Sequence, residues 1–381
     1  MKILHLSDLH IGRKLCEYPL LEEQRYVLQE IINLVKQERP QAVLVSGDVY
    51  DTSVPSAEAS QLLDWFFSEL DIEGLTLIVI SGNHDSAQRL DFGSLRLKKT
   101  GLYMKGVFDG NFTPVSLFDE YGEVRFYPIP FFRRKEAEIC YDRSFDDYTA
   151  AFCHVVSSLH LDQSVRNVAL SHQFVTGAAL SESESFSVVG NVESISVEAY
   201  APFDYAALGH IHRAQQVRSP RLRYSGTPMK YSLSEVDHVK TVTMVTLGPK
   251  PSSEELCAIE VQEIPLKPLH DMIRKTGSFD ELFNMPETEE FLYVRLTDAE
   301  RIPNAIAMLR GKCPRILKVD YPNEKTDSLL PSEGKGKADI TKTPLELIRE
   351  FYAYTNNGQE MEEETAAILR QAVKEVWGEN T

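Results

Sequence analysis

The sequence predicts an α/β fold with a mostly parallel sheet. The basis is that strand-like and helix-like segments alternate in the first part of the chain. Apolar runs rich in β-branched residues at positions 2–7, 41–46 and 75–81 are typical of strands buried on both faces. Residues 20–37 and 57–70, between these runs, repeat apolar side chains at helical spacing. Strands that alternate with helices in this way form parallel sheets with right-handed crossovers.

Each of the three strands is followed by a short polar motif. Asp-Leu-His at residues 8–10 follows the first, Gly-Asp-Val-Tyr-Asp at 47–51 the second, and Gly-Asn-His-Asp at 82–85 the third. Parallel strands end at the same edge of a sheet, which is where open α/β sheets place their binding sites. One Asp-x-His pair alone is more often a capping aspartate beside a surface histidine. Three such ends on one edge are hard to explain as caps.

Two later strands also end in histidine. A buried strand at 167–171 is followed by His172, and one at 203–208 by Gly-His-Ile-His at 209–212. A lone histidine at a strand end is more often structural than functional, whereas two imidazoles two residues apart behind a glycine can face one site. The other elements predicted in this part are a helix at 88–98, short strands and turns at 102–132, a helix at 145–160, hairpin strands at 222–247 and a strand at 256–263.

The composition changes after about residue 264. Residues 265–321 predict a small α+β unit, and residues 322–342, which carry Pro, Gly, Lys and Ser and few apolar side chains, are typical of a flexible linker. Within the small unit we expect helices near 279–283 and 302–309 and strands at 291–296 and 315–320.

Residues 343–381 predict two amphipathic helices. Thr343 is the expected N-cap of the first, Pro344 stands at its first helical position, and Glu346 completes a capping box. Two short amphipathic helices cannot bury their apolar faces fully on each other. They either fold back on the preceding domain or clasp a helix or coiled coil of a partner, and we favour the clasp.

Composition restricts the class of protein. The chain has 381 residues, enough for two or three domains. It has no apolar run near the roughly 20 residues of a membrane span, and no charged segment before a small-residue cleavage site, so we expect no secretion. Its five scattered cysteines indicate reduced thiols in a cytoplasmic protein. The net charge of −17 argues against a protein coated for nucleic-acid binding, but allows a local basic groove or a partner that holds the nucleic acid.

The strand-end side chains predict a two-metal centre. Two metals about 3.5–4 Å apart need a bridging carboxylate and about three further ligands each, and Asp48, on the strand between the other motifs, is the natural bridge. Oxygen and nitrogen ligands without thiolate suit Mn²⁺ or Fe²⁺ and tolerate Zn²⁺, and we expect Mn²⁺. The seven candidate ligands are Asp8, His10, Asp48, Asn83, His172, His210 and His212.

Such a centre predicts hydrolysis of a phosphate ester, by in-line attack of a metal-activated water on phosphorus. His84 directly follows the candidate ligand Asn83, so it can reach a phosphoryl or leaving-group oxygen without binding metal. We expect His84 to stabilise the transition state or act as a general acid. Asp85 is expected to orient His84 and keep it protonated.

The five motifs, in this order, resemble those of the calcineurin-like metallophosphoesterases over residues 1 to about 247. The resemblance implies a β-sandwich flanked by helices. It also implies one metal held by Asp8, His10, Asp48 and His212, and a second held by Asp48, Asn83, His172 and His210.

Longer stretches resemble the SbcD family of nuclease subunits, the bacterial relatives of the eukaryotic double-strand-break nuclease of meiotic recombination. They are Gly47–Thr52 with Pro55-Ser56, Ser171–Gly177 with Ser181–Glu184, Phe203–Arg213 and Tyr224–Pro228. The resemblance implies a nuclease domain at 1–264, a capping domain at 265–321, a linker at 322–342 and C-terminal helices at 343–381.

Members of the SbcD family work with SbcC, an ATPase of the SMC/Rad type, and the resemblance implies that the C-terminal helices hold the base of its coiled coil. The implied activity is ATP-dependent exonuclease action on double-strand DNA ends, with endonuclease action on single strands and hairpins. The implied setting is DNA repair, recombination and replication, in the cytoplasm at the nucleoid. A homodimer through the helices near 56–70 and 88–98 is also implied.

Asp51 is a third catalytic candidate beside His84 and Asp85. Archaeal and eukaryotic relatives carry a histidine at this position, so a histidine-based role there does not transfer to this chain.

Two other functions compete with the nuclease. A phosphatase, cyclic-nucleotide phosphodiesterase or nucleotide pyrophosphatase of the same fold would use the same metal centre, but a small-substrate enzyme needs neither a capping unit nor C-terminal helices. A non-catalytic scaffold would be expected to lose His84 or some ligands, and this chain retains all of them.

Overall fold

The computed structural model describes residues 1–72, 74–180 and 194–321. The expected linker at 322–342, the C-terminal helices at 343–381 and the motif at 181–184 lie outside these residues. The described residues divide into two compact units, the first comprising Met1–Lys275, Pro286–Tyr293 and Ile306–Lys318, and the second Thr276–Met285, Val294–Ala305 and residues 319–321.

The first unit contains two six-stranded mixed sheets. In the first sheet, with the order β14-β13-β1-β4-β5-β6, strands β1, β4, β5 and β6 are parallel and β13 pairs antiparallel with both β1 and β14. Its strands are β1 (Lys2–Leu6), β4 (Ala42–Ser46), β5 (Thr76–Ile80), β6 (Leu102–Lys105), β13 (Thr241–Leu247) and β14 (Ile259–Pro265). The three strands predicted at the start of the chain are therefore confirmed as parallel neighbours.

The second sheet has the order β11-β12-β10-β9-β8-β7, with a parallel centre from β8 to β12 and antiparallel edge pairs. Its strands are β7 (Val115–Asp119), β8 (Gly122–Ile129), β9 (Arg166–His172), β10 (Tyr205–Gly209), β11 (Gln215–Val217) and β12 (Ser219–Tyr224). Strands β12 and β13 lie in different sheets, so the hairpin expected at 222–247 is wrong.

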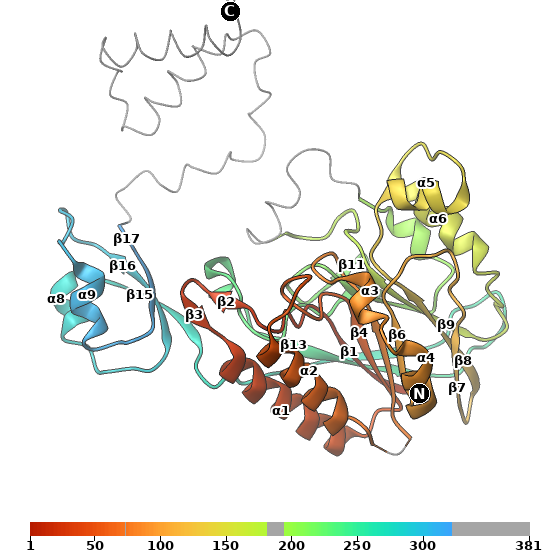
Figure 1. The fold of residues 1–381 in the computed structure, drawn as a ribbon, viewed down its shortest axis with the longest axis horizontal. Coiled ribbons are helices and arrows are strands. Elements are labelled where there is room, and N and C mark those ends of the chain that lie inside the picture. The colour runs from red at the N-terminus through yellow and green to blue at the C-terminus, as the bar shows by residue number, and fades with distance from the viewer. Residues whose placement is uncertain (73, 181–193, 322–381) are drawn as a thin grey trace, which may run out of the picture. The chain divides into compact units, whose positions relative to one another are not determined.

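The two sheets pack face to face. Alternate side chains of β1 show this, because Ile3 joins the core shared by both sheets whereas Leu4 faces the helices. Val168 and Leu170 contribute to the shared core from the second sheet. Helices then cover the outer faces, which gives the sandwich flanked by helices that the family resemblance implied (Figure 1).

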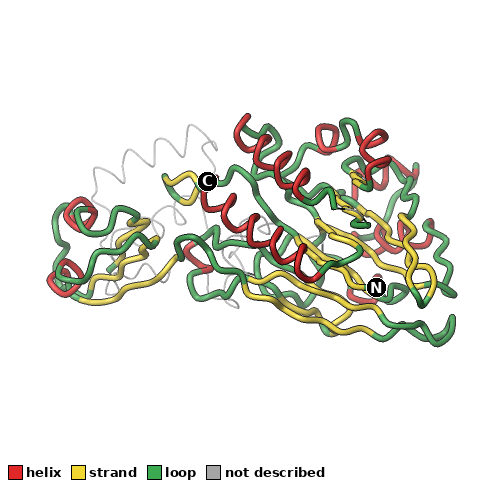
Figure 2. The backbone as a smooth tube through the Cα atoms, turned by 90° about the horizontal axis from the view of Figure 1, so that it is seen from below, coloured by secondary structure: helices red, strands yellow, loops and turns green. Residues whose placement is uncertain are grey.

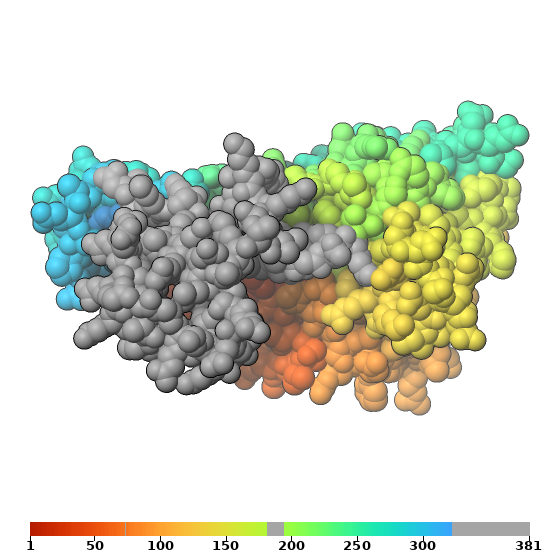
Figure 3. Space-filling model, turned by 90° about the horizontal axis from the view of Figure 1, so that it is seen from above, coloured from red at the N-terminus to blue at the C-terminus, as the bar shows by residue number. Residues whose placement is uncertain are grey.

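Helices α1 and α2 pack side by side on the first sheet (Figure 1, Figure 2). Helices α5 and α6 cover the second sheet. Figure 3 shows their surface beside the segment that follows residue 194. In that segment, the N–H of Ser196 donates to Thr149 Oγ1 at 3.0 Å. The helices are α1 (Leu21–Glu38), α2 (Ala57–Glu69), α3 (Ala87–Leu90), α4 (Ser94–Leu97), α5 (Arg134–Tyr141) and α6 (Tyr148–Ser158), with short 3₁₀ helices η1 (Lys98–Thr100), η2 (Val197–Tyr200) and η3 (Leu233–Glu235).

The helix expected at 88–98 is broken into α3 and α4. Gly93 between them has a φ of +80°, in the left-handed region that glycine tolerates without strain. Apolar spacing alone does not report such a break.

The remaining elements are a short hairpin and a three-stranded sheet with two helices. A short hairpin is formed by β2 (Lys14–Leu15) and β3 (Tyr18–Pro19). A three-stranded sheet has the order β15-β16-β17. Its strands and helices are β15 (Met272–Gly277), α8 (Phe279–Phe283), β16 (Phe291–Leu296), α9 (Ala305–Arg310) and β17 (Ile316–Asp320), which include the two helices and two strands predicted there. No helix in the described residues combines the length and apolarity needed to cross a membrane.

Candidate metal centre

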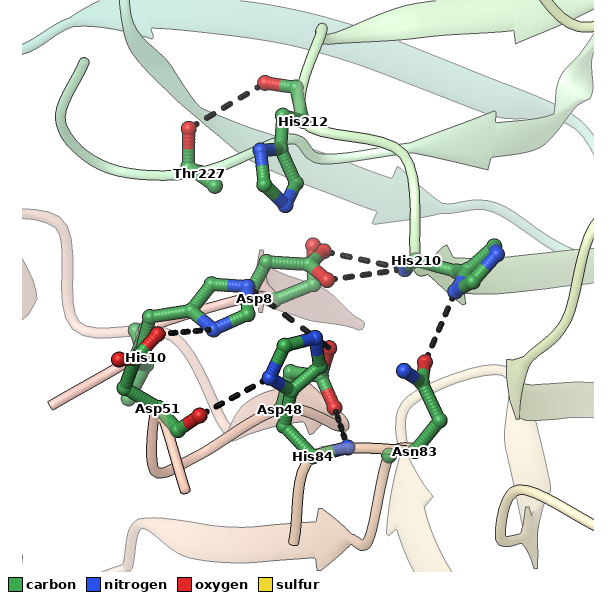
Figure 4. Close-up of polar contacts among 12 residues, drawn as sticks. Asp8, His10, Asp48, Asp51, Asn83, His84, His210, His212 and Thr227 are labelled. Carbon is green, nitrogen blue, oxygen red and sulfur yellow. Dashed lines mark hydrogen bonds and ion pairs between the residues drawn. The ribbon is translucent and has the colours of Figure 1, made fainter. Parts of the chain in front are cut away.

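The predicted site residues meet at one rim of the sandwich, and Figure 4 labels all of them except His172 and Asp85. Strands β1, β4 and β5 deliver the first three motifs there, and β9 and β10 of the other sheet deliver the histidines. Backbone hydrogen bonds join the first two loops, from Asp8 N–H to Gly47 O at 3.0 Å and from His10 N–H to Asp48 O at 2.9 Å.

The backbone at this rim is strained and close-packed. Asp8, His10, Asp48 and His210 all have positive φ values, a conformation that non-glycine residues rarely adopt and that gathers at functional sites. Glycines precede Asp48, Asn83 and His210 at positions where there is no room for a side chain. A Cβ at Gly82 would collide with the carboxylate of Asp48, and one at Gly209 with the carbonyl oxygen of Ser46.

Asn83 is the meeting point of two histidines. Its Oδ1 lies 3.1 Å from His172 Nε2 and 2.9 Å from His210 Nδ1. The opposite nitrogen of His172, Nδ1, donates to Ser46 O at 2.8 Å, so Nε2 is the nitrogen that faces the site. Asn83, His172 and His210 therefore present three ligand atoms to one point.

Asp48 lies at the centre of the site. Its Oδ2 is 3.3 Å from His172 Nε2 and 3.7 Å from His10 Nε2, and its Oδ1 accepts the backbone N–H of His84 at 2.9 Å. Burial by itself would raise the pKa of Asp48, but the surrounding histidines, His172 first, hold it well below its usual range. In turn, burial alone would lower the pKa of His172, and the charge of Asp48 raises it instead. Asp48 is thus a carboxylate placed between two groups of ligands.

The second group consists of Asp8, His10 and His212, each of which offers a ligand atom within 4.8 Å of the others. Asp8 accepts the backbone N–H of His210 at 3.0 and 3.2 Å, and burial raises the pKa of Asp8 to about 6. Burial lowers the pKa of His10 to about 4, so its ring is neutral at pH 7.

These residues fit divalent metal ions. Both ring nitrogens of His10 are buried and make no hydrogen bond, which is costly in a polar side chain unless another partner takes the lone pair. The separations between neighbouring ligand atoms, 2.9 to 3.7 Å, are close to the roughly 3 Å expected between ligands that share one ion with bonds of about 2.1 Å. Two further groups of three, His10 with Asp48 and His84, and Asp8 with Asp48 and His172, are also close enough to hold an ion.

His84 lies at the open side of the site, with 37% of its side chain exposed. Its Nδ1 donates to the backbone carbonyl of Asp51 at 2.9 Å, and its Nε2 lies 4.0 Å from Asp48 Oδ2. Its ring also meets that of His10 edge to face, with 4.9 Å between centroids. A polar ring nitrogen is therefore available on the side that a substrate can reach.

Asp85 does not contact His84 as we expected. Its carboxylate accepts the backbone N–H groups of Gly82, Tyr50 and Val49 at 2.8, 2.9 and 3.1 Å. Burial, followed by the nearby charge of Asp48, raises the pKa of Asp85 to about 6. Asp85 joins the loops after β4 and β5, and the carbonyl of Asp51 replaces it as the partner that orients His84.

The side chain of Asp51 turns away from His84. Its Oδ1 forms an ion pair with Arg13 Nη1 at 2.6 Å and lies 3.5 Å from His10 Nδ1. Burial opposes the charge of Asp51, but His10 and Arg13 lower its pKa to about 2. The geometry therefore places the carboxylate of Asp51 behind a candidate ligand, and a catalytic role for Asp51 stays a prediction.

Sequence reasoning missed Glu235, which is fully buried at the end of η3. Its Oε1 lies 3.2 Å from His212 Nδ1 and its Oε2 forms an ion pair with Lys240 Nζ at 2.5 Å. Burial would raise the pKa of Glu235, but Lys240 and His212 lower it to about 2. No strand-end motif marks this residue, so the linear sequence carries no signal for it.

Comparison with known proteins agrees with this geometry. The model of the calcineurin-like phosphoesterases matches residues 1–214, and that of the type 5 capsule protein repressor C-terminal domain matches residues 268–356. A protein of Staphylococcus saprophyticus, named as the SbcD subunit of the nuclease SbcCD, is 30% identical over 98% of this chain and 100% of its own length. A protein of the same name from Staphylococcus epidermidis is 30% identical over 83% of this chain and 84% of its own length.

Proposed function

This chain belongs to the calcineurin-like phosphoesterase family, and we propose that it is the nuclease subunit of an SbcCD-type complex that hydrolyses phosphodiester bonds in DNA. The observation that carries the proposal is the convergence of carboxylate, amide and imidazole ligands from two sheets on one rim. The names of the matched relatives, which cover 98% and 83% of this chain, support a nuclease, and the SbcD family resemblance implies that its substrate is DNA.

We assign the ligands to two metals as the family resemblance implies. Asp8, His10, Asp48 and His212 would hold one ion, Asp48, Asn83, His172 and His210 the other, and the oxygen and nitrogen donors favour Mn²⁺. When bound, such a pair of ions supplies an activated water and neutralises the charge of a phosphoryl group. The protein's own contribution is to keep the ligands in place, through Ser46 O behind His172 and the backbone N–H of His210 on Asp8.

His84 is proposed to stabilise the transition state or to protonate the leaving oxygen. Its Nδ1–H is held by Asp51 O, so the ring is fixed with Nε2 free to donate to a substrate oxygen when protonated. Its 37% exposure beside buried candidate ligands such as His10 and His172 supports this role.

An ATPase of the SbcC type is the proposed partner, held by the helices at 343–381. The names of the relatives describe one subunit of a two-part nuclease. The match to the second family model runs from residue 268 to 356, so it covers most of the proposed capping domain at 265–321, the linker at 322–342 and the start of these helices. The acidic net charge of −17 is consistent with a subunit whose DNA is gripped mainly by its partner, at the nucleoid in the cytoplasm.

A homodimer through α2, α3 and α4 is also part of the proposal. The surface between these helices is hollowed by a cavity of about 510 Å³ lined by apolar side chains that include Leu63, Phe67 and Leu97. Phe92 at its edge is 87% exposed and Leu95 in α4 is 85% exposed. Large exposed apolar side chains around a hollow are typical of a surface that another protein covers.

Cleavage of a labelled hairpin-ended DNA duplex with Mn²⁺ tests the function. Wild-type protein, with and without the ATPase and ATP, would be compared with His84→Ala and with His154→Ala, a histidine on α6 outside the site. We expect cleavage by wild type and His154→Ala, stimulation by partner and ATP, and a loss of about 10²–10⁴-fold in His84→Ala with metal still bound. Activity on a small chromogenic phosphodiester without any on DNA would contradict the proposal.

A further inference from the structure

The histidines of the two proposed metal sites have different partners behind their rings. At the site of Asp8 and Asp48, His212 Nδ1 lies 3.2 Å from the carboxylate of Glu235. At the other site, His172 Nδ1 donates to the neutral backbone carbonyl of Ser46 at 2.8 Å. Only one of these two partners carries a full negative charge.

Glu235 is held firmly in this position. It is fully buried, and its second oxygen pairs with Lys240 Nζ at 2.5 Å. Lys240 is held in turn by Thr227 Oγ1 at 2.6 Å and by the carbonyl of His212 itself at 2.9 Å. The His212 ring and backbone are therefore both anchored to one buried ion pair (Figure 4 shows His212 beside Thr227).

His10, the other histidine of the same proposed site, also has a carboxylate near one of its ring nitrogens. Its Nδ1 lies 3.5 Å from Asp51 Oδ1, at ion-pair distance, while its Nε2 faces Asp48 at 3.7 Å. Carboxylates therefore stand behind both histidines of one site, whereas a neutral backbone carbonyl stands behind His172 of the other.

We propose that Glu235 is a positioning residue that holds His212 with its proton on Nδ1 and its lone pair on Nε2, and that it makes the site of Asp8, His10, Asp48 and His212 the tighter of the two metal sites. This inference rests on the proposed two-metal function. A carboxylate behind a histidine fixes the ring orientation and raises its basicity as a ligand, and its loss typically weakens metal binding by about 10–100-fold. A neutral carbonyl fixes the orientation without adding charge.

Calorimetric titration of the metal-free full chain with Mn²⁺ tests the inference without any substrate. Wild type should show a tighter and a weaker binding event, with His212→Asn removing the tighter and His172→Asn the weaker. In Glu235→Gln the amide oxygen still accepts the Nδ1–H but the charge is gone, so we expect the tighter dissociation constant to rise about 10–100-fold and the weaker to change little. Glu235→Gln/Lys240→Met, which removes both charges of the pair, gives the same comparison if the single variant does not fold.

Asp204→Asn is the matched control. Asp204 is also fully buried and paired with a lysine, Lys250 at 2.9 Å, and it accepts backbone N–H groups from Asn167 and Cys257. It should lose thermal stability but keep both Mn²⁺ affinities. Equal weakening of both sites in Glu235→Gln, or no weakening of either, would overturn the inference.

The same preparations separate this inference from the proposed function. Hairpin cleavage by wild type together with unchanged Mn²⁺ binding in Glu235→Gln would defeat the inference alone. The predicted selective loss of the tighter site, in a protein that cleaves no DNA, would support the inference while defeating the nuclease assignment.

Discussion

The carboxylate of Asp48 lies 3.3 Å from Nε2 of His172, although the first residue follows β4 of one sheet and the second ends β9 of the other. The candidate metal centre therefore exists only when both sheets are docked. Metal binding and the stability of the sandwich should be linked for this reason.

Mn²⁺ is accordingly expected to raise the melting temperature of the metal-free protein. At a free concentration about 100 times the dissociation constant, the gain in unfolding free energy is about 2.7 kcal/mol per site. His172→Asn should retain only part of the shift, because one set of ligands remains. Thermal scans with and without Mn²⁺ measure this, and a shift of equal size in the variant would contradict the link.

Gly82→Ala should abolish metal binding while the protein still folds. The added Cβ would collide with the carboxylate and backbone nitrogen of Asp48, which must move. Gly311→Ala is the control, since its nearest atom would be Met308 O at 3.4 Å. Mn²⁺ titration of both variants gives the comparison, and normal binding by Gly82→Ala would show that Asp48 is not held where the structure places it.

Asp85→Ala should destabilise the protein, whereas His84→Ala should not. Loss of the Asp85 carboxylate leaves three backbone N–H groups without an acceptor, at a cost of about 1–3 kcal/mol for each one that stays buried and unpaired. His84 is partly exposed and donates one hydrogen bond. Denaturant unfolding of the two variants measures the difference, and equal stabilities would mean that Asp85 does not join the two loops.

Because His5 is buried, we expect the folded protein to become less stable in acid. Burial, followed by the charge of Arg223, lowers the pKa of His5 to about 3 in the folded state, against an ordinary value of 6.5. Between these two pH values the unfolded chain binds a proton that the folded chain does not, so the unfolding free energy falls as the pH falls, by at most about 1.4 kcal/mol per pH unit.

His5→Gln tests this prediction. The amide can donate to Leu208 O in place of Nε2–H, which lies 3.2 Å away, and it does not titrate. Metal-free wild type and variant would be unfolded with urea at pH 7.5 and pH 5.0. We expect the variant to lose about 2 kcal/mol less than wild type over this interval. Parallel losses in both proteins would show that His5 is not the group responsible.

Phe92→Glu should convert the proposed homodimer to a monomer, because the charge would stand in the apolar surface of α3 and α4. Phe118→Glu is the control, since Phe118 is also exposed, at 72%, but lies on β7. Light scattering after size-exclusion chromatography reports the mass. A dimer that survives Phe92→Glu would place the interface elsewhere, and a monomeric wild type would remove the homodimer from the proposal.

Much of the first sheet was predictable because the patterns that indicate its strands lie within short segments of the sequence. The strands that became β1, β4 and β5 are runs of apolar residues bounded by helices, and buried parallel strands require that pattern. The seven candidate ligands were found for the same reason, since each follows a strand end, and the structure brings all seven together. Their assignment to individual metals stays a prediction.

Other features depend on contacts between segments far apart in the sequence. Strands β12 and β13 each alternate as a hairpin would, but β12 pairs with β10 in one sheet and β13 with β1 in the other. Asp85 was expected to hold His84, yet its carboxylate accepts backbone N–H groups that only the folded loops bring within reach.

By itself, the sequence determined the fold class, the strand ends and the chemical identity of the candidate ligands, because periodicity and residue type are properties of short segments. Only the tertiary structure decided what stands behind each ligand, with Glu235 behind His212, Asp51 beside His10 and Ser46 O behind His172. The hydrogen-bond partners in a buried site depend on which groups lie close together and are shielded from water. For this site, these groups meet only when the two sheets pack against each other.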